Sequence, residues 1–430
     1  MDFLSVRLNF AWMLASRAIA VASGLLVAGM INRALGPAGR GVYAEMQTWI
    51  GLFVVLFGMS FDSGIYHHAN KSIYGEDDNS RFVTILWLSV GQSMIGAIGL
   101  TLFVYIAPGH VSSQTVQFIP YLAVLLFSSM ITANLTVFTQ SLGRIKFAAL
   151  VGVIQACLGL LIVSYGYLTE DLDLFYAVCC LIAVQTSGLA VFLTILLRVG
   201  MGRGRFSWTA ARGIIKAGAK QHIATIATFV YARINQLIVF RYGGDAEAGI
   251  FAVALSLAFY LTFIPETLRT VLYPRVIHSS DEYDVTVRSI RLSLYGWGAA
   301  VMILMLFAKP IIIAYAGEKF VGSVNTFRIL LIAAWLLPLS SLLAPFYVKK
   351  GAFSMASLSA LILGIISVLL NCAFVPRLLS EGAALATALT CAIGFMMTCL
   401  FLWYLSKANP LSIFVPNFKR EARKFAGFFG

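Results

Sequence analysis

Two arginines lie deep inside long apolar stretches, where charged side chains are rare. Arg17 follows Arg7 by ten residues, or about 15 Å along a helix, which is too deep for its charge to reach a membrane surface easily. Arg233 lies in the polar sequence YARINQ, beside Asn235 and Gln236. Intramembrane ionisable residues usually face a cavity, and a guanidinium binds phosphate oxygens through paired hydrogen bonds. We predict that Arg17 and Arg233 bind an anionic, phosphate-bearing substrate.

Other ionisable residues near the ends of apolar stretches are candidates for a gate or an ion-coupling site: Asp62, Lys220, Glu266 and Arg269. Asp62 either pairs with Arg17, which would give both residues a structural role, or binds a coupling proton or sodium ion. Glu266 and Arg269 are three residues apart on one helix face and partly neutralise each other. Lys220 is close enough to the end of its stretch to reach the membrane surface.

Several apparent chemical signals point to no cofactor. His67 and His68 are adjacent, and neighbouring helical residues point about 100° apart, so they do not form a compact metal site. The six cysteines all fall in apolar stretches without C-x-x-C spacing, which favours inert thiols. The glycines of GMGRGR, residues 200–205, follow an apolar helix instead of a strand, which excludes a dinucleotide or phosphate-binding loop. We therefore expect neither catalytic residues nor a metal.

The elements that position these side chains are membrane-spanning helices. The chain has 430 residues, of which 60% are hydrophobic and only 11% charged, against about 25% charged in soluble domains. Its apolar residues come in blocks of roughly 20 or more, long enough to cross a bilayer, and continuous blocks of this length favour helices over a barrel. The predicted spans are 10–32, 42–66, 82–107, 116–140, 146–168, 173–198, 216–240, 250–273, 290–315, 324–348, 353–375 and 381–406. The fold class is an all-α polytopic membrane protein with about twelve transmembrane helices.

Lysine and arginine are distributed unequally between the two sides of these spans. One side carries the N-terminus, most of the basic loops and the basic tail, and this bias predicts that both termini are cytoplasmic. The opposite loops are expected to hold Arg33, Arg40, Arg241, Lys309, Lys319, Arg328 and Arg377. The net charge of +13 then reflects topology and attraction to anionic membrane lipids. Because the basic residues are spread over successive loops, a nucleic-acid partner is not expected.

An internal repeat relates the two halves of the chain at an offset of 208 residues. At this offset LGPAGRGVYAEMQ, residues 35–47, falls on residues 243–255, which include all but the first residue of YGGDAEAGIFAVA, residues 242–254. Gly36 then falls on Gly244 and Gly41 on Gly249. Since six spans separate the copies, the halves run in the same direction and form two parallel six-helix bundles with a pseudo-two-fold axis along the membrane normal. We predict that these four glycines act as hinges.

The repeat also divides the chain into predicted domains. They are an N-terminal bundle over 1–199, a cytoplasmic interfacial linker over 200–215, a C-terminal bundle over 216–406, and a basic aromatic cytoplasmic tail over 407–430. Substrate is expected between the bundles, which would rock against each other to give alternating access.

Two motifs carry a resemblance to a known family. NRALGPAGRGVYA after the first span and VPRLLSEGAALATALT, residues 375–390, resemble the Wzx-type polysaccharide or O-antigen flippases of the multidrug/oligosaccharidyl-lipid/polysaccharide exporter superfamily. The resemblance implies translocation of undecaprenyl-diphosphate-linked oligosaccharides across the bacterial inner membrane. It further implies a polysaccharide polymerase and a chain-length regulator as partners. Some relatives have fourteen helices, whereas about twelve are predicted here.

Three classes of function follow from these observations. A flippase with a cationic central cavity agrees best with the arginines, and a lipid II-type flippase is its close alternative. A cation-coupled multidrug exporter would favour carboxylates in the cavity. A membrane enzyme, such as a sugar polymerase, would normally carry a large loop with catalytic side chains, and no loop here much exceeds about 20 residues. Loops of this length leave no room for a nucleotide-binding domain, so we expect transport without ATP, and H⁺ or Na⁺ remain open as coupling ions.

Overall fold

The computed structural model describes the chain except for residues 1–2, 70–76, 268–281, 351–352, 408–413 and 415–430. Helices make up the described part, with the bounds α1 (Phe3–Gly58), α2 (Phe61–His68), α4 (Asp78–Ile106), α5 (Ser113–Gln117), α6 (Ile119–Ser141), α7 (Ile145–Leu168), α8 (Leu174–Arg198), α9 (Trp208–Leu261), α11 (Glu282–Leu292), α12 (Gly298–Leu306), α13 (Ala308–Ala316), α14 (Ser323–Ser341), α15 (Ala344–Lys350) and α16 (Phe353–Ser406). Within the described residues, nine helices are long and apolar enough to cross a membrane. Helices satisfy their own backbone hydrogen bonds, which a hydrocarbon environment demands.

Three of these nine helices each consist of two helical segments. Helices α1, α9 and α16 continue through a break in backbone conformation at Gly36, Gly244 and Leu379 respectively. Each of the three therefore holds two of the predicted spans, which brings the nine helices to twelve spans. The predicted all-α polytopic fold is confirmed, and the molecule is a multi-pass membrane protein.

The first two breaks have the same geometry. Gly36 has φ 65° and ψ −176°, and Gly244 has φ 72° and ψ −170°. Only glycine adopts this region without strain, and a Cβ at either position would meet no atom within 4 Å. Backbone conformation, not space, therefore requires glycine here. Pro37 then begins the second segment of α1, a position at which proline fits because the first helical N–H groups need no intrahelical partner.

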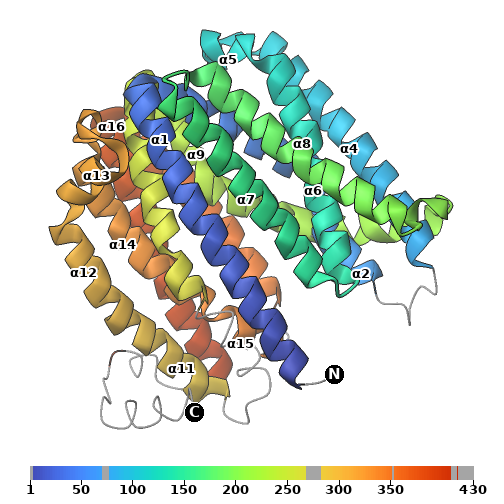
Figure 1. Cartoon of the computed structure of the whole chain (residues 1–430). Coiled ribbons are helices and arrows are strands. Elements are labelled where there is room, and N and C mark those ends of the chain that lie inside the picture. The colour runs from blue at the N-terminus through green and yellow to red at the C-terminus, as the bar shows by residue number, and fades with distance from the viewer. Residues whose placement is uncertain (1–2, 70–76, 268–281, 351–352, 408–413, 415–430) are drawn as a thin grey trace.

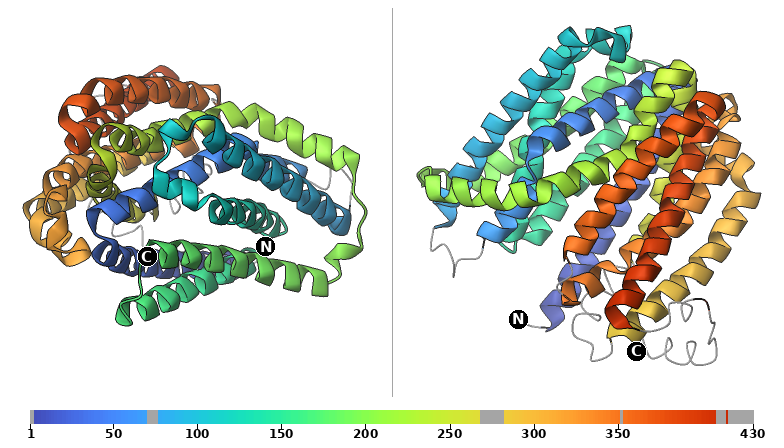
Figure 2. Two further views of the ribbon diagram at one scale, coloured as in Figure 1. Left: turned by 90° about the horizontal axis from the view of Figure 1, so that it is seen from above. Right: turned by 180° about the vertical axis from the view of Figure 1, so that it is seen from behind.

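The helices form two bundles, one from α1 to α8 and the other from α9 to α16 (Figures 1 and 2). Leu126 and Phe138 are fully buried in the first bundle, as are Phe251 and Phe327 in the second. The breaks in α1, α9 and α16 lie at one end of the molecule, which we call the hinge end. Helix α1 begins and α16 finishes at the opposite, terminal end (Figure 1).

The two bundles meet at the hinge end through a reciprocal glycine contact. A Cβ on Gly41 would lie 1.8 Å from the carbonyl oxygen of Asp245, and a Cβ on Gly249 would lie 1.9 Å from that of Pro37. Residue 37 corresponds to 245 and residue 41 to 249 at the offset of 208. The contact thus repeats itself across the pseudo-two-fold axis. Small residues allow this close approach of two helix backbones.

The first segment of α9, residues 208–243, connects the bundles. Near its start, the site of a Cβ on Gly218 is 2.3 Å from the carbonyl oxygen of Met59, next to α2. Near its end, Asn235 donates to the Thr387 hydroxyl of α16 at 3.0 Å. Half of the predicted linker, from Trp208 onward, therefore forms the first turns of α9. The predicted tail over 407–430 lies almost wholly outside the described residues.

Candidate functional site

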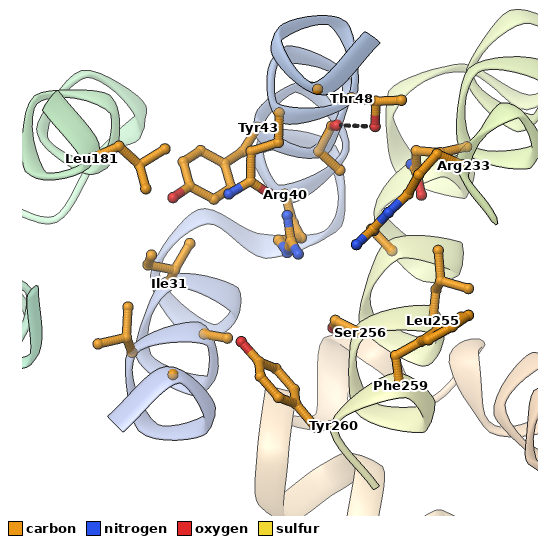
Figure 3. A pocket seen from close by; sticks show the side chains of 18 of the residues that line it. Ile31, Arg40, Tyr43, Thr48, Leu181, Arg233, Leu255, Ser256, Phe259 and Tyr260 are labelled. Carbon is orange, nitrogen blue, oxygen red and sulfur yellow. Dashed lines mark hydrogen bonds between the residues drawn. The ribbon is translucent and has the colours of Figure 1, made fainter. Parts of the chain in front are cut away.

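A cavity of about 760 Å³ lies between the two bundles. Both segments of α1 and both segments of α9 line it, and α8 contributes Leu181 (Figure 3). The four segments are the first two spans of each half, so equivalent parts of the repeat enclose one central space. This position matches the substrate site expected between parallel halves.

Arg233 lies on the first segment of α9 and lines this cavity. Its side chain is exposed, and Figure 3 shows it extending into the central space. The neighbouring side-chain amides of Gln236 and Asn235 point in different directions. Gln236 also lines the cavity while donating to the Ala248 carbonyl at 3.0 Å, whereas Asn235 bonds to Thr387 inside the C-terminal bundle.

Arg40 is a second cationic residue of the cavity. It is only 6% exposed, and its Nε donates to the Asn32 side-chain oxygen at 2.8 Å. Its guanidinium carbon lies 5.4 Å from the centre of the Tyr43 ring. Its Nη1 has no hydrogen-bond partner among the described residues. A buried guanidinium with an unused donor is costly unless a ligand completes it.

The two arginines give the cavity a cationic character. Figure 3 shows both side chains directed into the same space, from α1 and from α9. No aspartate or glutamate is among the described residues that line it. No carboxylate of this lining neutralises the two charges, so an anion with several oxygens would be attracted. The geometry suits a phosphate or diphosphate group.

Arg17 is not among the residues that line the cavity. It is exposed on the first segment of α1, seven residues before Gly24, which does line the cavity. Seven residues are almost two helical turns, so Arg17 shares the face of Gly24 and lies about 10 Å nearer the terminal end. In the described structure, Arg17 does not pair with Asp62. Asp62 is exposed in the first turn of α2, which packs against α9.

The other predicted gate residues lie apart from the cavity lining. Lys220 is exposed on α9. Glu266 is half-buried and accepts a hydrogen bond from the Ser341 hydroxyl of α14 at 2.9 Å. Arg269 lies outside the described residues, so its predicted pairing with Glu266 stays a prediction.

Uncharged polar residues of the helices fall into two groups. Gln47 and Thr48 line the cavity from the second segment of α1. Asn134 instead donates to Ser89 and Gln92 inside the N-terminal bundle, at 2.9 and 3.1 Å. Gln155 likewise donates to the Val184 carbonyl at 3.0 Å. These bundle-interior amides therefore stabilise helix packing.

Sequence reasoning placed Arg40 in a loop, and this assignment was wrong, because the structure places Arg40 in α1. The apolar run begins only at Val42, but α1 continues directly after the break at Gly36. Pro37 was the available signal, because proline favours the first turn of a helix. With a helix starting there, Arg40 falls inside its first turn and turns toward the cavity.

A comparison with known protein families finds a family that matches most of the chain. Residues 30–325 match the family described as "Polysaccharide biosynthesis protein". This region includes both glycine breaks and both cavity arginines. No curated protein matched the sequence.

Solved structures show the same fold. A multidrug resistance MATE family transporter of the MOP superfamily, in an inward-facing conformation, aligns with a TM-score of 0.68 at 14% identity, covering 90% of this chain and 96% of that one. The lipid II flippase MurJ, in an inward closed conformation, aligns with a TM-score of 0.67 at 14% identity, covering 94% and 88%. A MOP superfamily transporter from Pyrococcus furiosus aligns with a TM-score of 0.64 at 15% identity, covering 94% and 96%.

Proposed function

Since the chain belongs to the polysaccharide biosynthesis protein family, we propose that it flips undecaprenyl-diphosphate-linked oligosaccharides across the bacterial inner membrane. The product would serve synthesis of O-antigen, capsule or exopolysaccharide. The observation that carries this proposal is the central cavity with Arg40 and Arg233 and no carboxylate among its described lining. The diphosphate is the part of such a lipid that two guanidinium groups would hold, because each can bind its oxygens in a fork.

A cation-coupled multidrug exporter of the same fold is the alternative of a different kind. Organic cations need a negative or neutral cavity, and two arginines without a nearby carboxylate would repel them. A lipid II-type flippase shares the diphosphate and so agrees equally well with the arginines. Only the sugars distinguish that substrate from the one proposed.

The repeated breaks support alternating access as the mechanism. Rotation about Gly36 and Gly244 would tilt the first span of each half, while the reciprocal contact of Gly41 with Gly249 keeps the bundles together at the hinge end. With both termini in the cytoplasm, the terminal end would be the side from which substrate enters. Asp62, Lys220, Glu266 and Arg269 remain the proposed gate or ion-coupling residues, with H⁺ or Na⁺ as the ion. A polymerase and a chain-length regulator would take over the flipped product.

The test is complementation of a strain that lacks this protein. We expect lipid-linked oligosaccharide to accumulate on the cytoplasmic leaflet, and the wild-type protein to clear it. Arg233→Gln should fail to clear it at equal membrane abundance. Arg241→Gln is the matched control, because this exposed arginine lies eight residues further along α9 and outside the cavity lining. An absence of accumulation in the deletion strain would exclude polysaccharide export, and drug efflux would be measured next.

A further inference from the structure

The lining of the central cavity has a polar side and a mainly apolar side. The first segment of α1 and the second segment of α9 contribute a mainly apolar wall with Val27, Leu255 and Phe259, which also carries the hydroxyls of Ser256 and Tyr260. The second segment of α1 and the first segment of α9 contribute most polar groups: Arg40, Gln47, Thr48, Arg233 and Gln236. A ligand with one polar and one apolar part would orient itself accordingly.

A second cavity extends the polar side. Its volume is about 350 Å³, and it is lined by Val55 of α1 and by seven residues of α9. It shares Phe229 and Arg233 with the central cavity, so the two spaces adjoin. From Arg233 it follows α9 back to Gln221, which is about 18 Å toward the terminal end. We call this space the α9 groove.

Uncharged polar side chains line the groove in a regular pattern. Gln221, Thr225 and Thr228 are spaced i, i+4 and i+7, so they share one face of α9. Thr228 donates its hydroxyl proton to the Ala224 carbonyl at 2.8 Å, which leaves its oxygen lone pairs available to accept. Gln221 is exposed and offers both amide donors and a carbonyl acceptor. Thr225 is held by Ser60 at 2.8 Å.

This chemistry favours a neutral ligand rich in hydroxyl groups. Sugar hydroxyls both donate and accept, and Thr228 and Gln221 together do the same. Arg233 is the one charged residue among those that line the groove in the described structure, and it lies where the groove meets the central cavity. An anionic group and a neutral polar chain could therefore bind end to end.

We propose that the α9 groove binds the sugar residues of the lipid-linked substrate and contributes to sugar selectivity. This inference rests on the proposed flippase function. The diphosphate lies at Arg40 and Arg233, the sugars extend along Gln221, Thr225 and Thr228 toward the terminal end, and the lipid faces the apolar wall. Thr228 and Gln221 are then the residues that distinguish a glycosylated lipid from a bare one.

The experiment compares two ligands on purified full-length protein in lipid nanodiscs. One is undecaprenyl diphosphate without sugar, and the other is the lipid-linked oligosaccharide extracted from the deletion strain. We expect Thr228→Val with Gln221→Leu to weaken binding of the glycosylated lipid about tenfold, the effect of losing two ordinary hydrogen bonds. Binding of bare undecaprenyl diphosphate should stay unchanged, which also shows that the variant is folded.

Thr101→Val is the matched control. Thr101 donates to the Ala97 carbonyl at 2.9 Å, as Thr228 does to Ala224, but it lies on α4 outside both cavities. The control should bind both lipids like the wild type. Equal weakening of both lipids in the groove variant, or no weakening of either, would overturn the sugar assignment and leave the flippase proposal intact. Failure of the wild-type protein to bind either lipid would instead overturn the proposed function and the groove assignment with it.

Discussion

Two buried charges lie five residues apart on the second segment of α1, and their surroundings are opposite. Glu45 is fully buried, and its carboxylate accepts from the Trp49 indole at 3.2 Å and from the backbone N–H of Ser112 at 3.1 Å. It also accepts from the hydroxyls of Ser112 and Thr115, each at 2.7 Å. Arg40 has one side-chain acceptor, Asn32, and an Nη1 without a partner among the described residues.

The difference separates a structural charge from a binding charge. The hydrogen bonds to a fully bonded buried ion offset the cost of removing it from water. They also hold the neighbouring elements, here α1 and α5, in one arrangement. A buried ion with unused donors destabilises the free protein and is stabilised only when a ligand arrives. Glu45 should therefore matter for folding and Arg40 for substrate, although both lie in the same helix near the same hinge.

The largest expected effect comes from removing both cavity cations. Arg40→Gln with Arg233→Gln should raise the free energy of diphosphate-lipid binding by about 3–6 kcal/mol, since each charge-assisted hydrogen bond contributes about 1.5–3 kcal/mol. The Tm in detergent should not fall, because the free protein loses an incompletely bonded cation. The measurements are lipid binding in nanodiscs and scanning fluorimetry. A fall in Tm with unchanged binding would assign these arginines to the structure instead.

Glu45→Gln tests the opposite half of the comparison. The amide nitrogen of glutamine cannot accept a hydrogen bond, so donors from Ser112 and Thr115 lose their acceptor. We expect a destabilisation of about 2–3 kcal/mol, seen as a lower Tm, together with wild-type affinity for lipid in the folded fraction. Glu45→Asp keeps the charge but shortens the reach, and it should lose less stability. Normal Tm with lost transport would contradict a structural role for Glu45.

The sequence predicts the twelve spans and the repeat because both depend on local signals. An apolar block of bilayer length requires a helix whatever surrounds it, and the glycines at 36 and 244 mark backbone conformations that other residues avoid. The break at Leu379, with φ 49°, carries no such signal, because a leucine is held there by its surroundings.

The cavity lining depends on packing and is less accessible from one sequence. The apolar run begins at Val42, so the predicted span starts there and leaves Arg40 outside. In the structure, the second segment of α1 begins at Pro37 and includes Arg40. Asn134 and Gln155 have the residue types of sugar-binding side chains, yet neighbouring helices of their own bundle satisfy them. The rotation of each helix about its axis decides which polar residues face the cavity, and this rotation cannot be inferred from residue type.

Asn32→Asp would give Arg40 a counter-charge and so satisfy its charge inside the protein, as neutral hydrogen-bond donors already do for Glu45. The two side chains are nearly identical in shape, and the Asn32 oxygen already accepts from Arg40 Nε at 2.8 Å. The new carboxylate should neutralise the guanidinium and weaken diphosphate-lipid binding about tenfold, which corresponds to about 1.4 kcal/mol. Stability should hold or improve, as measured by Tm. Unchanged lipid affinity would show that the charge on Arg40 does not act on the substrate.

Arg17→Gln is expected to have the smallest effect, and it extends the comparison to an exposed charge. Arg17 lies about 10 Å from Gly24 toward the terminal end, on the same face of α1 but outside the cavity lining. Water and salt screen a charge in this position, so its attraction for a diphosphate is worth about 0.2–1 kcal/mol. Lipid affinity should fall by at most about fivefold at low ionic strength, and the difference from wild type should vanish as salt is raised. The effect of Arg40→Gln should persist at high salt, because that charge is buried. Equal salt sensitivity of the two variants would place both arginines in the same electrostatic environment. It would remove the distinction between the exposed Arg17 and the buried Arg40.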